Sequence, residues 1–242
     1  MRVTKHGDYL VQMTRFPRVF PVNCYVVRED DGLTLVDTAI TTSARAILDA
    51  AREFSLPIRR IVLTHAHADH VGALDALHKQ LPGVEALSSA RDARFLAGER
   101  SLDSDEPQSP LRGAYQTTKT RPDRLLSHGD HVGSLEVIGT PGHTPGHIAL
   151  FDRRDGTLIA GDAFQTRAGV AVSGTVRPLF PFPAWATWHR PSALASARLL
   201  RSLGPARLAV GHGEVLERPL AEMDRAIEVL ARALGKVAAH GA

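Results

Sequence analysis

Two patterns of apolar residues alternate along this chain, one typical of strands and the other of helices. Residues 9–13, 23–27 and 33–36 are short runs rich in β-branched and apolar residues, which predicts strands. Over residues 42–54 the apolar positions recur at helical spacing instead, which predicts a helix. The same two patterns predict strands at residues 60–64, 84–87, 135–138, 147–151, 157–159 and 208–210, and helices at residues 70–81, 90–97, 192–203 and 219–234.

The order of these elements is β-rich, α/β, β-rich and α/β again. Each sheet must bury its apolar face against another element. Two similar halves, packed sheet against sheet with the helices outside, satisfy that order.

Two stretches lack either period. Residues 98–123 are polar and contain Pro107, Pro110 and Pro122, so we expect a long loop there, with some helix still allowed. A loop of this length inside a compact domain is usually functional or mobile. Residues 178–188 are rich in proline and aromatic residues and precede a predicted helix.

Composition narrows the class of protein. The 242 residues are 43% hydrophobic and 23% charged, as in an ordinary globular protein. Lys plus Arg exceed Asp plus Glu by 29 − 26 = 3 and form no long run, which gives no support to nucleic-acid binding. Residues 1–9 are polar and no run of about 18 apolar residues occurs, so we expect neither an export signal nor a membrane span. The single cysteine, Cys24, excludes an intrachain disulfide and fits a cytoplasmic location.

The strongest chemical signal directly follows a predicted strand. Residues 64–70 read Thr-His-Ala-His-Ala-Asp-His, so His65, His67, Asp69 and His70 fall within six residues. Neutral imidazole is the commonest metal ligand among side chains, and the small alanines let alternate side chains converge. Closed structural zinc sites are usually rich in cysteine. The cluster therefore indicates a catalytic metal site; a metal-free turn or a structural site is the alternative.

Three later positions offer further ligands. Residues 139–147 read Gly-Thr-Pro-Gly-His-Thr-Pro-Gly-His, and the prolines and glycines indicate a sharp turn that presents His143 at a loop tip. His147 begins the next strand, so we expect it to support the site and not to bind metal. Asp162 and His212 each follow a glycine at the end of a predicted strand. Alone, Asp162 would more often be a turn or helix N-cap residue, and His212 a surface residue.

Asp37 is a further acidic residue at the end of a predicted strand. Metal sites generally contain groups that orient the metal-binding histidines without touching the metal. Asp37 is either such an orienting group or a turn or N-cap aspartate before the first helix.

With these residues the chain resembles the metallo-β-lactamase-fold hydrolase superfamily over about residues 23–213. The resemblance rests on five features in the family's order: Asp37, the cluster His65-Ala-His67-Ala-Asp69-His70, His143, Asp162 and His212. It implies an α/β (α+β) fold, a four-layer αββα sandwich of two similar halves with the site at one edge between the sheets. We expect one domain of this kind over residues 1–242.

The resemblance also implies how two divalent metal ions are held. One ion would bind His65, His67 and His143, the other would bind Asp69, His70 and His212, and Asp162 would bridge them. The family usually binds zinc, so Zn²⁺ is expected, with iron or manganese as alternatives. Two such ions generate hydroxide near neutral pH, and Asp69 would orient this nucleophile or transfer a proton as the catalytic residue.

Departures from known subgroups of the family narrow the reaction. Only 30 residues follow His212, which disfavours glutathione thioesters, because their hydrolases have a long helical C-terminal domain. The β-lactamases of this fold are exported, and lactone-opening members have a tyrosine where Ala163, Phe164 and Gln165 stand here. We therefore expect a hydrolase of a small-molecule ester, thioester or lactone. The alternatives are an iron-dependent oxidoreductase of the same fold, acting on persulfides or O₂, and a non-catalytic metal-binding module.

Aromatic residues are the candidates for a substrate pocket: Phe164, Phe182, Trp185, Trp188 and Tyr115. Those between residues 178 and 188 would otherwise pack the following helix onto the sheet. The loop at residues 98–123, with Arg112, Lys119 and Arg121, either covers the site or is simply solvated. We expect a small-molecule partner, no nucleic acid and no membrane, and leave a homodimer open.

Overall fold

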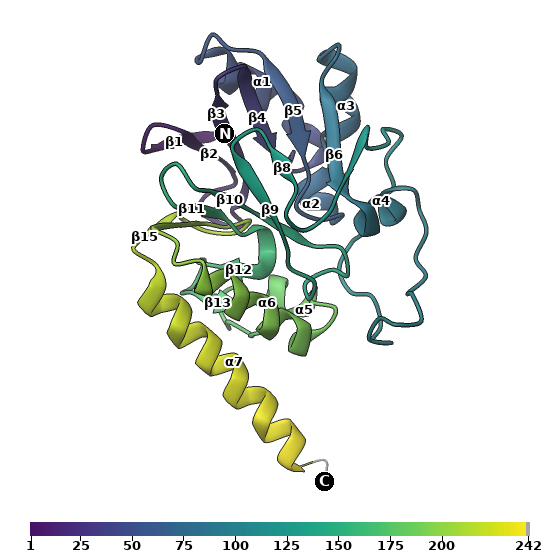
Figure 1. Ribbon diagram of the computed structural model, residues 1–242, viewed down its shortest axis with the longest axis vertical. Helices are drawn as coiled ribbons and strands as arrows, with labels where there is room; N and C mark the ends of the chain where they lie inside the picture. Colours follow the sequence, from purple (N-terminus) through teal and green to yellow (C-terminus); the bar gives the residue numbers. More distant parts are fainter. Residues whose placement is uncertain (241–242) are drawn as a thin grey trace.

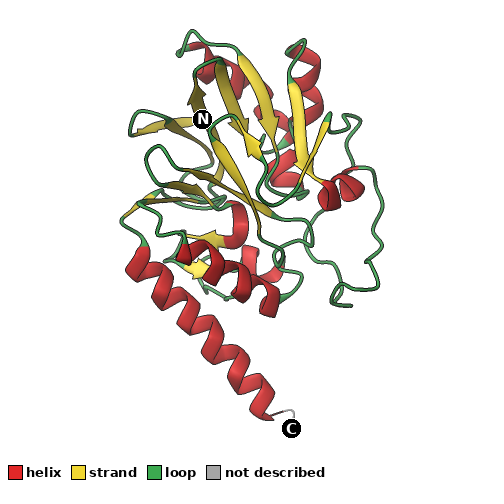
Figure 2. Ribbon diagram, in the orientation of Figure 1, coloured by secondary structure: helices red, strands yellow, loops and turns green. Residues whose placement is uncertain are grey.

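Two β-sheets pack face to face, and helices cover their outer faces (Figures 1 and 2). This computed structural model describes residues 1–240, with side chains described through residue 236. The seven-stranded sheet has the order β1 (Arg2–His6), β2 (Leu10–Arg15), β3 (Val22–Glu29), β4 (Gly32–Val36), β5 (Ile58–Val62), β6 (Glu85–Ser89) and β7 (Arg124–Leu126). Its strands are antiparallel from β1 to β4 and parallel from β4 to β7.

The second sheet has six strands. Their order is β15 (Leu216–Glu217), β14 (Arg207–Ala209), β11 (Thr157–Ile159), β10 (Ile148–Asp152), β9 (Leu135–Gly139) and β8 (His131–Val132). A separate hairpin joins β12 (Phe164–Gln165) and β13 (Ala171–Val172). The helices of the first half are α1 (Ala44–Arg52), α2 (Ala68–Val71), α3 (Leu74–Gln80) and α4 (Ala90–Leu96); those of the second are α5 (Phe182–Trp185), α6 (Arg190–Ser202) and α7 (Leu220–His240).

Side-chain alternation along single strands explains why the sheets stack. In β10, Ile148 and Leu150 join the apolar cluster between the two sheets, whereas Ala149 and Phe151 join the cluster beneath α6 and α7. Successive residues of a strand point to opposite faces. Because both faces are covered, all five residues of β10 are buried. The expected four-layer αββα sandwich is therefore confirmed; its extent as one domain over residues 1–242 stays a prediction, and residues 241–242 lie outside the described part.

The helix predicted at residues 70–81 is divided into α2 and α3. The Gly72 N–H donates to the Ala39 carbonyl over 2.9 Å, and the Thr38 N–H donates to the His70 carbonyl over 2.6 Å. A Cβ at position 72 would lie 2.5 Å from the Thr41 backbone nitrogen, so only glycine permits this approach. Contacts with the loop after β4 therefore interrupt the helix that the periodicity predicted.

The sequence patterns missed β1. Its residues are polar and mostly half-exposed, and within the described chain the strand lies at the sheet edge and pairs only with β2. An edge strand needs no apolar alternation, because neither side of it is fully buried. Backbone pairing with β2, and not hydrophobic pattern, decides its conformation.

The segment at residues 98–123 is a long loop, as predicted, and the helix allowed there is absent from these described residues. Arg91 and Arg94 of α4 anchor its first part. Arg91 pairs with both oxygens of Glu106 at 2.7 Å, and Arg94 pairs with those of Asp103 at 2.7 and 2.8 Å. Bidentate guanidinium–carboxylate pairs fix geometry as well as supplying attraction.

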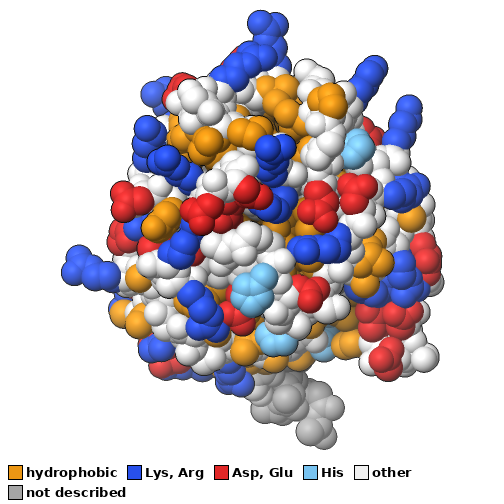
Figure 3. Space-filling view, turned by 45° about the horizontal axis from the view of Figure 1, so that its top comes forward, with side chains coloured by type: hydrophobic (Ala, Val, Ile, Leu, Met, Phe, Trp, Pro, Cys, Tyr) orange, Lys and Arg blue, Asp and Glu red, His pale blue; other side chains and the backbone are white. Residues whose placement is uncertain are grey.

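The surface shows the balanced charge of the sequence. On the face drawn in Figure 3, Lys and Arg side chains are interspersed with Asp and Glu side chains. Within the described residues, none of the helices combines the length and the apolar character needed to cross a bilayer.

Asp92 of α4 fastens the two halves together. Its buried carboxylate accepts the Ala66 N–H at 2.8 Å, in the loop after β5. It also accepts the Thr144 hydroxyl at 3.0 Å and the Gly146 N–H at 2.9 Å, in the loop between β9 and β10. These two loops contain predicted metal ligands, so Asp92 sets the spacing between them.

Replacing Asp92 with alanine should lower the free energy of unfolding by about 3–5 kcal/mol, because three buried donors lose a charged acceptor. Urea denaturation followed by circular dichroism measures this change. Asp49→Ala, at an exposed position on α1, is the control and should change stability by less than about 0.5 kcal/mol. If the two variants were equally stable, Asp92 would not hold the loops together.

Candidate metal centre

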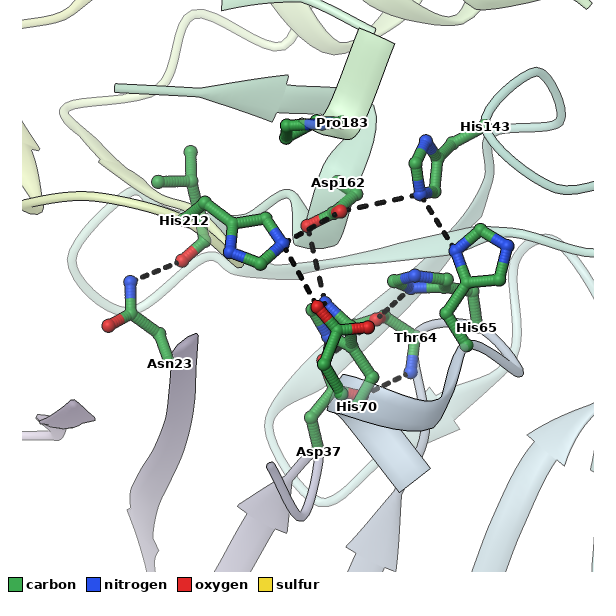
Figure 4. Close-up of polar contacts among 12 residues, drawn as sticks. Asn23, Asp37, Thr64, His65, His70, His143, Asp162, Pro183 and His212 are labelled. Atoms are coloured by element: carbon green, nitrogen blue, oxygen red, sulfur yellow. Dashed lines mark hydrogen bonds and ion pairs between the residues drawn. The ribbon is translucent and has the colours of Figure 1, made fainter. Parts of the chain in front are cut away.

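All seven predicted ligands meet at one edge of the sandwich, between the two sheets (Figure 4). Each lies in a loop or first helical turn just after a strand. They are His65 and His67 after β5, Asp69 and His70 in α2, His143 between β9 and β10, Asp162 after β11, and His212 after β14. Strands from both halves therefore deliver the donors to a common point.

Three groups of donors are close enough to hold an ion. These are His65, His67 and His143; His65, His70 and Asp162; and Asp69, His70 and His212, with the donor atoms of each group within 4.8 Å of one another. The first and third groups match the two predicted ligand sets. That they bind metal stays a prediction, which the geometry permits.

Asp162 lies between the two sets of ligands (Figure 4). Its Oδ2 is 3.3 Å from His143 Nε2 and 3.2 Å from His212 Nε2. Its Oδ1 is 3.4 Å from His70 Nε2. One carboxylate thus faces both donor groups, which is the position a bridging ligand needs.

The outward nitrogen of each of the five histidines has a fixed partner. The pairs are His65 Nδ1 with Thr64 Oγ1 (3.0 Å), His67 Nε2 with the Arg112 carbonyl (3.0 Å), His70 Nδ1 with Asp37 Oδ2 (2.8 Å), His143 Nδ1 with Ser173 Oγ (3.0 Å), and His212 Nδ1 with the Pro21 carbonyl (2.7 Å). The carbonyl and carboxylate partners of His67, His70 and His212 accept only, so they require N–H on the outward nitrogen. A neutral ring then presents its inward lone pair, as a metal ligand must. The inward nitrogens of His67 and His143 lie 3.0 Å apart.

The inward atoms fit a cation. His65 Nε2, His70 Nε2 and Asp162 Oδ1 are buried and have no hydrogen-bond partner. Buried polar atoms without partners are costly and rare. A divalent ion satisfies several such lone pairs together, and nitrogen and oxygen donors suit zinc, iron or manganese.

Asp37 lies directly behind the ligands. Its Oδ1 accepts the Thr64 N–H at 2.8 Å, and its Oδ2 accepts the Thr64 hydroxyl at 2.8 Å as well as the His70 ring. Its backbone has a φ of 60°, unusual for a residue other than glycine and a sign of local strain. Asp37 therefore lies where an orienting group is needed, and it is not a helix N-cap.

His147 supports the site from the other side. Its Nδ1 pairs with Thr140 Oγ1 at 2.8 Å, and its Nε2 accepts the backbone N–H of Asp162 at 3.1 Å. Both ring nitrogens are therefore occupied. This is the supporting role expected of His147, and it fixes the backbone that presents Asp162.

The two donor groups differ in proton affinity. Burial lowers the pKa of His65 and His143 well below the usual value and that of His67 to about 4. Burial acts in the same direction on His70 and His212. There the carboxylates of Asp162 and Asp69 outweigh it, raising the pKa of His70 to about 9 and that of His212 well above the usual value.

A cavity of about 410 Å³ opens above the centre. It is lined by Phe20, His67, Ala68, Asp69, Gly113, Ala114, His143, Asp162, Phe182, Pro183, Trp185, Ala186 and His212. Of the five aromatic residues predicted for a substrate pocket, Phe182 and Trp185 line this cavity, whereas Phe164, Trp188 and Tyr115 do not.

The three aromatic residues that do not line the cavity make other contacts. Phe164 is fully buried in the cluster beneath α6 and α7. Trp188 is buried, and its indole N–H donates to the Ser109 carbonyl at 3.0 Å, fastening the long loop. Tyr115 packs against the His67 ring at a centroid distance of 4.7 Å and lines a neighbouring groove. Composition located the aromatic segments but not the faces to which their side chains point.

Sequence patterns also missed residues that shape the site. Gly113 lies against His67, and a Cβ there would be 2.4 Å from Nε2. The only signal for it was a glycine within the long loop. Phe20 lines the cavity from the turn before β3, with its ring centroid 5.3 Å from that of His212. For Asp92 the sequence offered one indication, a serine three residues earlier. The Ser89 side chain accepts the Asp92 N–H and caps the start of α4.

Comparisons with known proteins agree with this geometry. The sequence model of the metallo-beta-lactamase superfamily matches residues 17–212. The chain is 48% identical over 229 residues to the uncharacterized protein YobT of Bacillus subtilis (strain 168), over 94% of this chain and 98% of that protein. It is 29% identical over 213 residues to the probable metallo-hydrolase YflN of the same organism, over 79% of this chain and 80% of YflN.

A solved structure shows the same likeness. The crystal structure of TTHA1623 in a di-iron-bound form superposes with a TM-score of 0.63 at 26% identity, covering 86% of this chain and 95% of that chain. The family match spans every predicted metal ligand, from His65 to His212. This chain therefore belongs to the metallo-beta-lactamase superfamily.

Proposed function

We propose that this chain is a dinuclear metal hydrolase that cleaves an ester, thioester or lactone bond in a small molecule. The observation that supports it is the pair of donor groups sharing Asp162, at the floor of a cavity open to a substrate. The relationship to a probable metallo-hydrolase favours the same class of reaction. The proposal includes the cytoplasmic location expected from the sequence.

The residues have separable tasks in this mechanism. His65, His67 and His143 would hold one divalent ion and Asp69, His70 and His212 the other, with Asp162 facing both. Bound ions of this kind supply Lewis acidity and lower the pKa of water toward neutrality. The outward hydrogen bonds of the five histidines aim their inward nitrogens at the centre, and a neutral ring held in this way presents an unprotonated inward nitrogen.

We assign the transfer of a proton in this mechanism to Asp69. Its side chain is 30% exposed and lines the cavity, whereas that of Asp162 is 3% exposed. Its Oδ2 lies 3.4 Å from His212 Nε2, so one oxygen faces the ligands. A carboxylate between the ligands and the cavity can orient an attacking water and accept its proton.

Zinc is the metal we propose, and iron is the specific alternative. The donors are imidazole nitrogens and carboxylate oxygens, which bind either metal. The related TTHA1623 was crystallised in a di-iron-bound form. If this chain also binds iron, the oxidoreductase alternative is favoured. Elemental analysis of the purified protein separates the two.

We expect the purified protein to contain two metal ions per chain. We also expect it to hydrolyse at least one member of a panel of ester, thioester and lactone substrates, and to lose this activity on chelation. Asp69→Ala should bind about one ion and lose at least about 100-fold in kcat, because it removes both a ligand and the proton acceptor. Asp49→Ala is the control and should keep both properties. Activity that survived complete removal of metal would exclude the proposal.

Metal binding should release protons unequally. At pH 7.5 the raised pKa of His70 and of His212 keeps both protonated before metal binds, whereas His65, His67 and His143 are neutral. Filling the site of Asp69, His70 and His212 should therefore release about two protons, and filling the three-histidine site about none. Metal affinity at the site of Asp69, His70 and His212 should fall as the pH is lowered. The three-histidine site should keep its ion until the pH nears the His67 pKa of about 4.

Calorimetric titration in two buffers of different ionisation enthalpy measures these protons. His212→Asn should abolish the proton-releasing step and leave the other step. Equal proton release in both steps would contradict the assignment of two electrostatically distinct sites.

A further inference from the structure

Most of the exposed large apolar side chains lie in two segments that meet beside the cavity, where the Phe20 ring lies 5.2 Å from that of Phe180 and 5.1 Å from that of Phe182. Among the described residues, nine large apolar side chains are exposed, and six of them lie in two segments, residues 16–19 and 176–185. We call these six the apolar rim: Phe16, Val19, Val176, Leu179, Phe182 and Trp185. The side chains of Leu179 and Val19 are 89% and 81% exposed. Single exposed apolar residues are ordinary, but such a cluster marks a binding surface.

The apolar rim is continuous with the floor of the cavity. Phe182 and Trp185 belong to both, since they line the cavity and are also exposed. The Phe20 ring lies 5.1 Å from that of Phe182 and 5.3 Å from that of His212, measured between centroids. An apolar surface therefore runs from a predicted metal ligand out to solvent. One molecule can therefore fill the cavity and also cover the apolar rim.

Away from the predicted metal ligands, the described residues that line the cavity carry no charged side chain, which favours an uncharged group against this wall. Among the described residues that line the cavity, none is Lys or Arg, and the carboxylates are those of Asp69 and Asp162. An anionic group placed there would lose water without gaining a cationic side chain. Arg100 lines a separate groove, on the far side of Gly113 and Ala114.

We propose that the apolar rim binds the hydrocarbon chain of an acyl ester or thioester whose carbonyl lies over the metal centre. This inference rests on the hydrolase function proposed above and specifies its substrate. The cavity of about 410 Å³ holds about fourteen non-hydrogen atoms at about 30 Å³ each. A short acyl group fits inside it, and a longer chain continues along the apolar rim.

A series of p-nitrophenyl esters from acetate to decanoate tests this assignment. Each added methylene should raise kcat/KM by about two- to fourfold, because a buried methylene gains at most about fourfold in binding. The double variant Val19→Ser, Leu179→Ser should flatten this rise for the longer esters. Leu199→Ser removes an exposed apolar side chain on α6, away from the apolar rim, and should preserve the rise. A rise that is unchanged in the double variant would overturn the proposal.

A binding measurement separates this inference from the hydrolase function. Trp185 is 60% exposed and Trp188 is 5% exposed, so tryptophan emission should shift when 1-decanol binds and shift far less with 1-butanol. Trp185→Phe should remove the signal. If no ester were hydrolysed and decanol still bound, the hydrolase proposal would fail and the apolar rim would stand as a chain-binding surface.

Other occupants of the apolar rim give distinct results. A second copy of the chain would cover Phe182 and Trp185, and sedimentation would show a dimer that dissociates in the Val19→Ser, Leu179→Ser variant. A lipid surface would retain the protein on phosphatidylcholine vesicles. Either result, together with absent decanol binding, would overturn the proposal.

Discussion

The structure depends on bringing five buried imidazoles, the buried Asp162 carboxylate and the half-buried Asp69 carboxylate within reach of one another. When all five rings are neutral and hold their protons on the outward nitrogens, the inward atoms are all acceptors and cannot satisfy each other. His65 Nε2, His70 Nε2 and Asp162 Oδ1 show the result, since each is buried and has no hydrogen-bond partner. Such an arrangement is stable in a folded protein when cations fill it.

Hydrogen bonds from surrounding residues hold these donors in place despite the free-energy cost of burying unpaired polar atoms. Asp37 fixes His70 and Thr64 from below, in a backbone conformation that non-glycine residues seldom adopt. Asp92 joins the loops that contain His67 and His143. His147 holds the backbone of Asp162. Polar groups outside the ligand set therefore convert flexible strand-end loops into a rigid centre.

The cavity above the centre combines two opposite environments. Its floor consists of predicted metal ligands, whereas Phe20, Phe182 and Trp185 form an apolar wall. Low polarity near a metal centre strengthens electrostatic interactions with a reacting carbonyl. The same wall favours uncharged parts of a substrate, so one surface contributes to both chemistry and selection.

The sequence by itself determined the layers of the fold and the donor residues. Hydrophobic period distinguishes strands from helices because each element buries one face, and histidines among small residues after a strand indicate metal. Other features depended on contacts between distant segments. The division between α2 and α3 follows from the approach of the loop after β4 to Gly72. The faces chosen by Phe164, Tyr115 and Trp188 were decided only by tertiary packing, because an aromatic side chain gains similar free energy in a core or in a pocket wall.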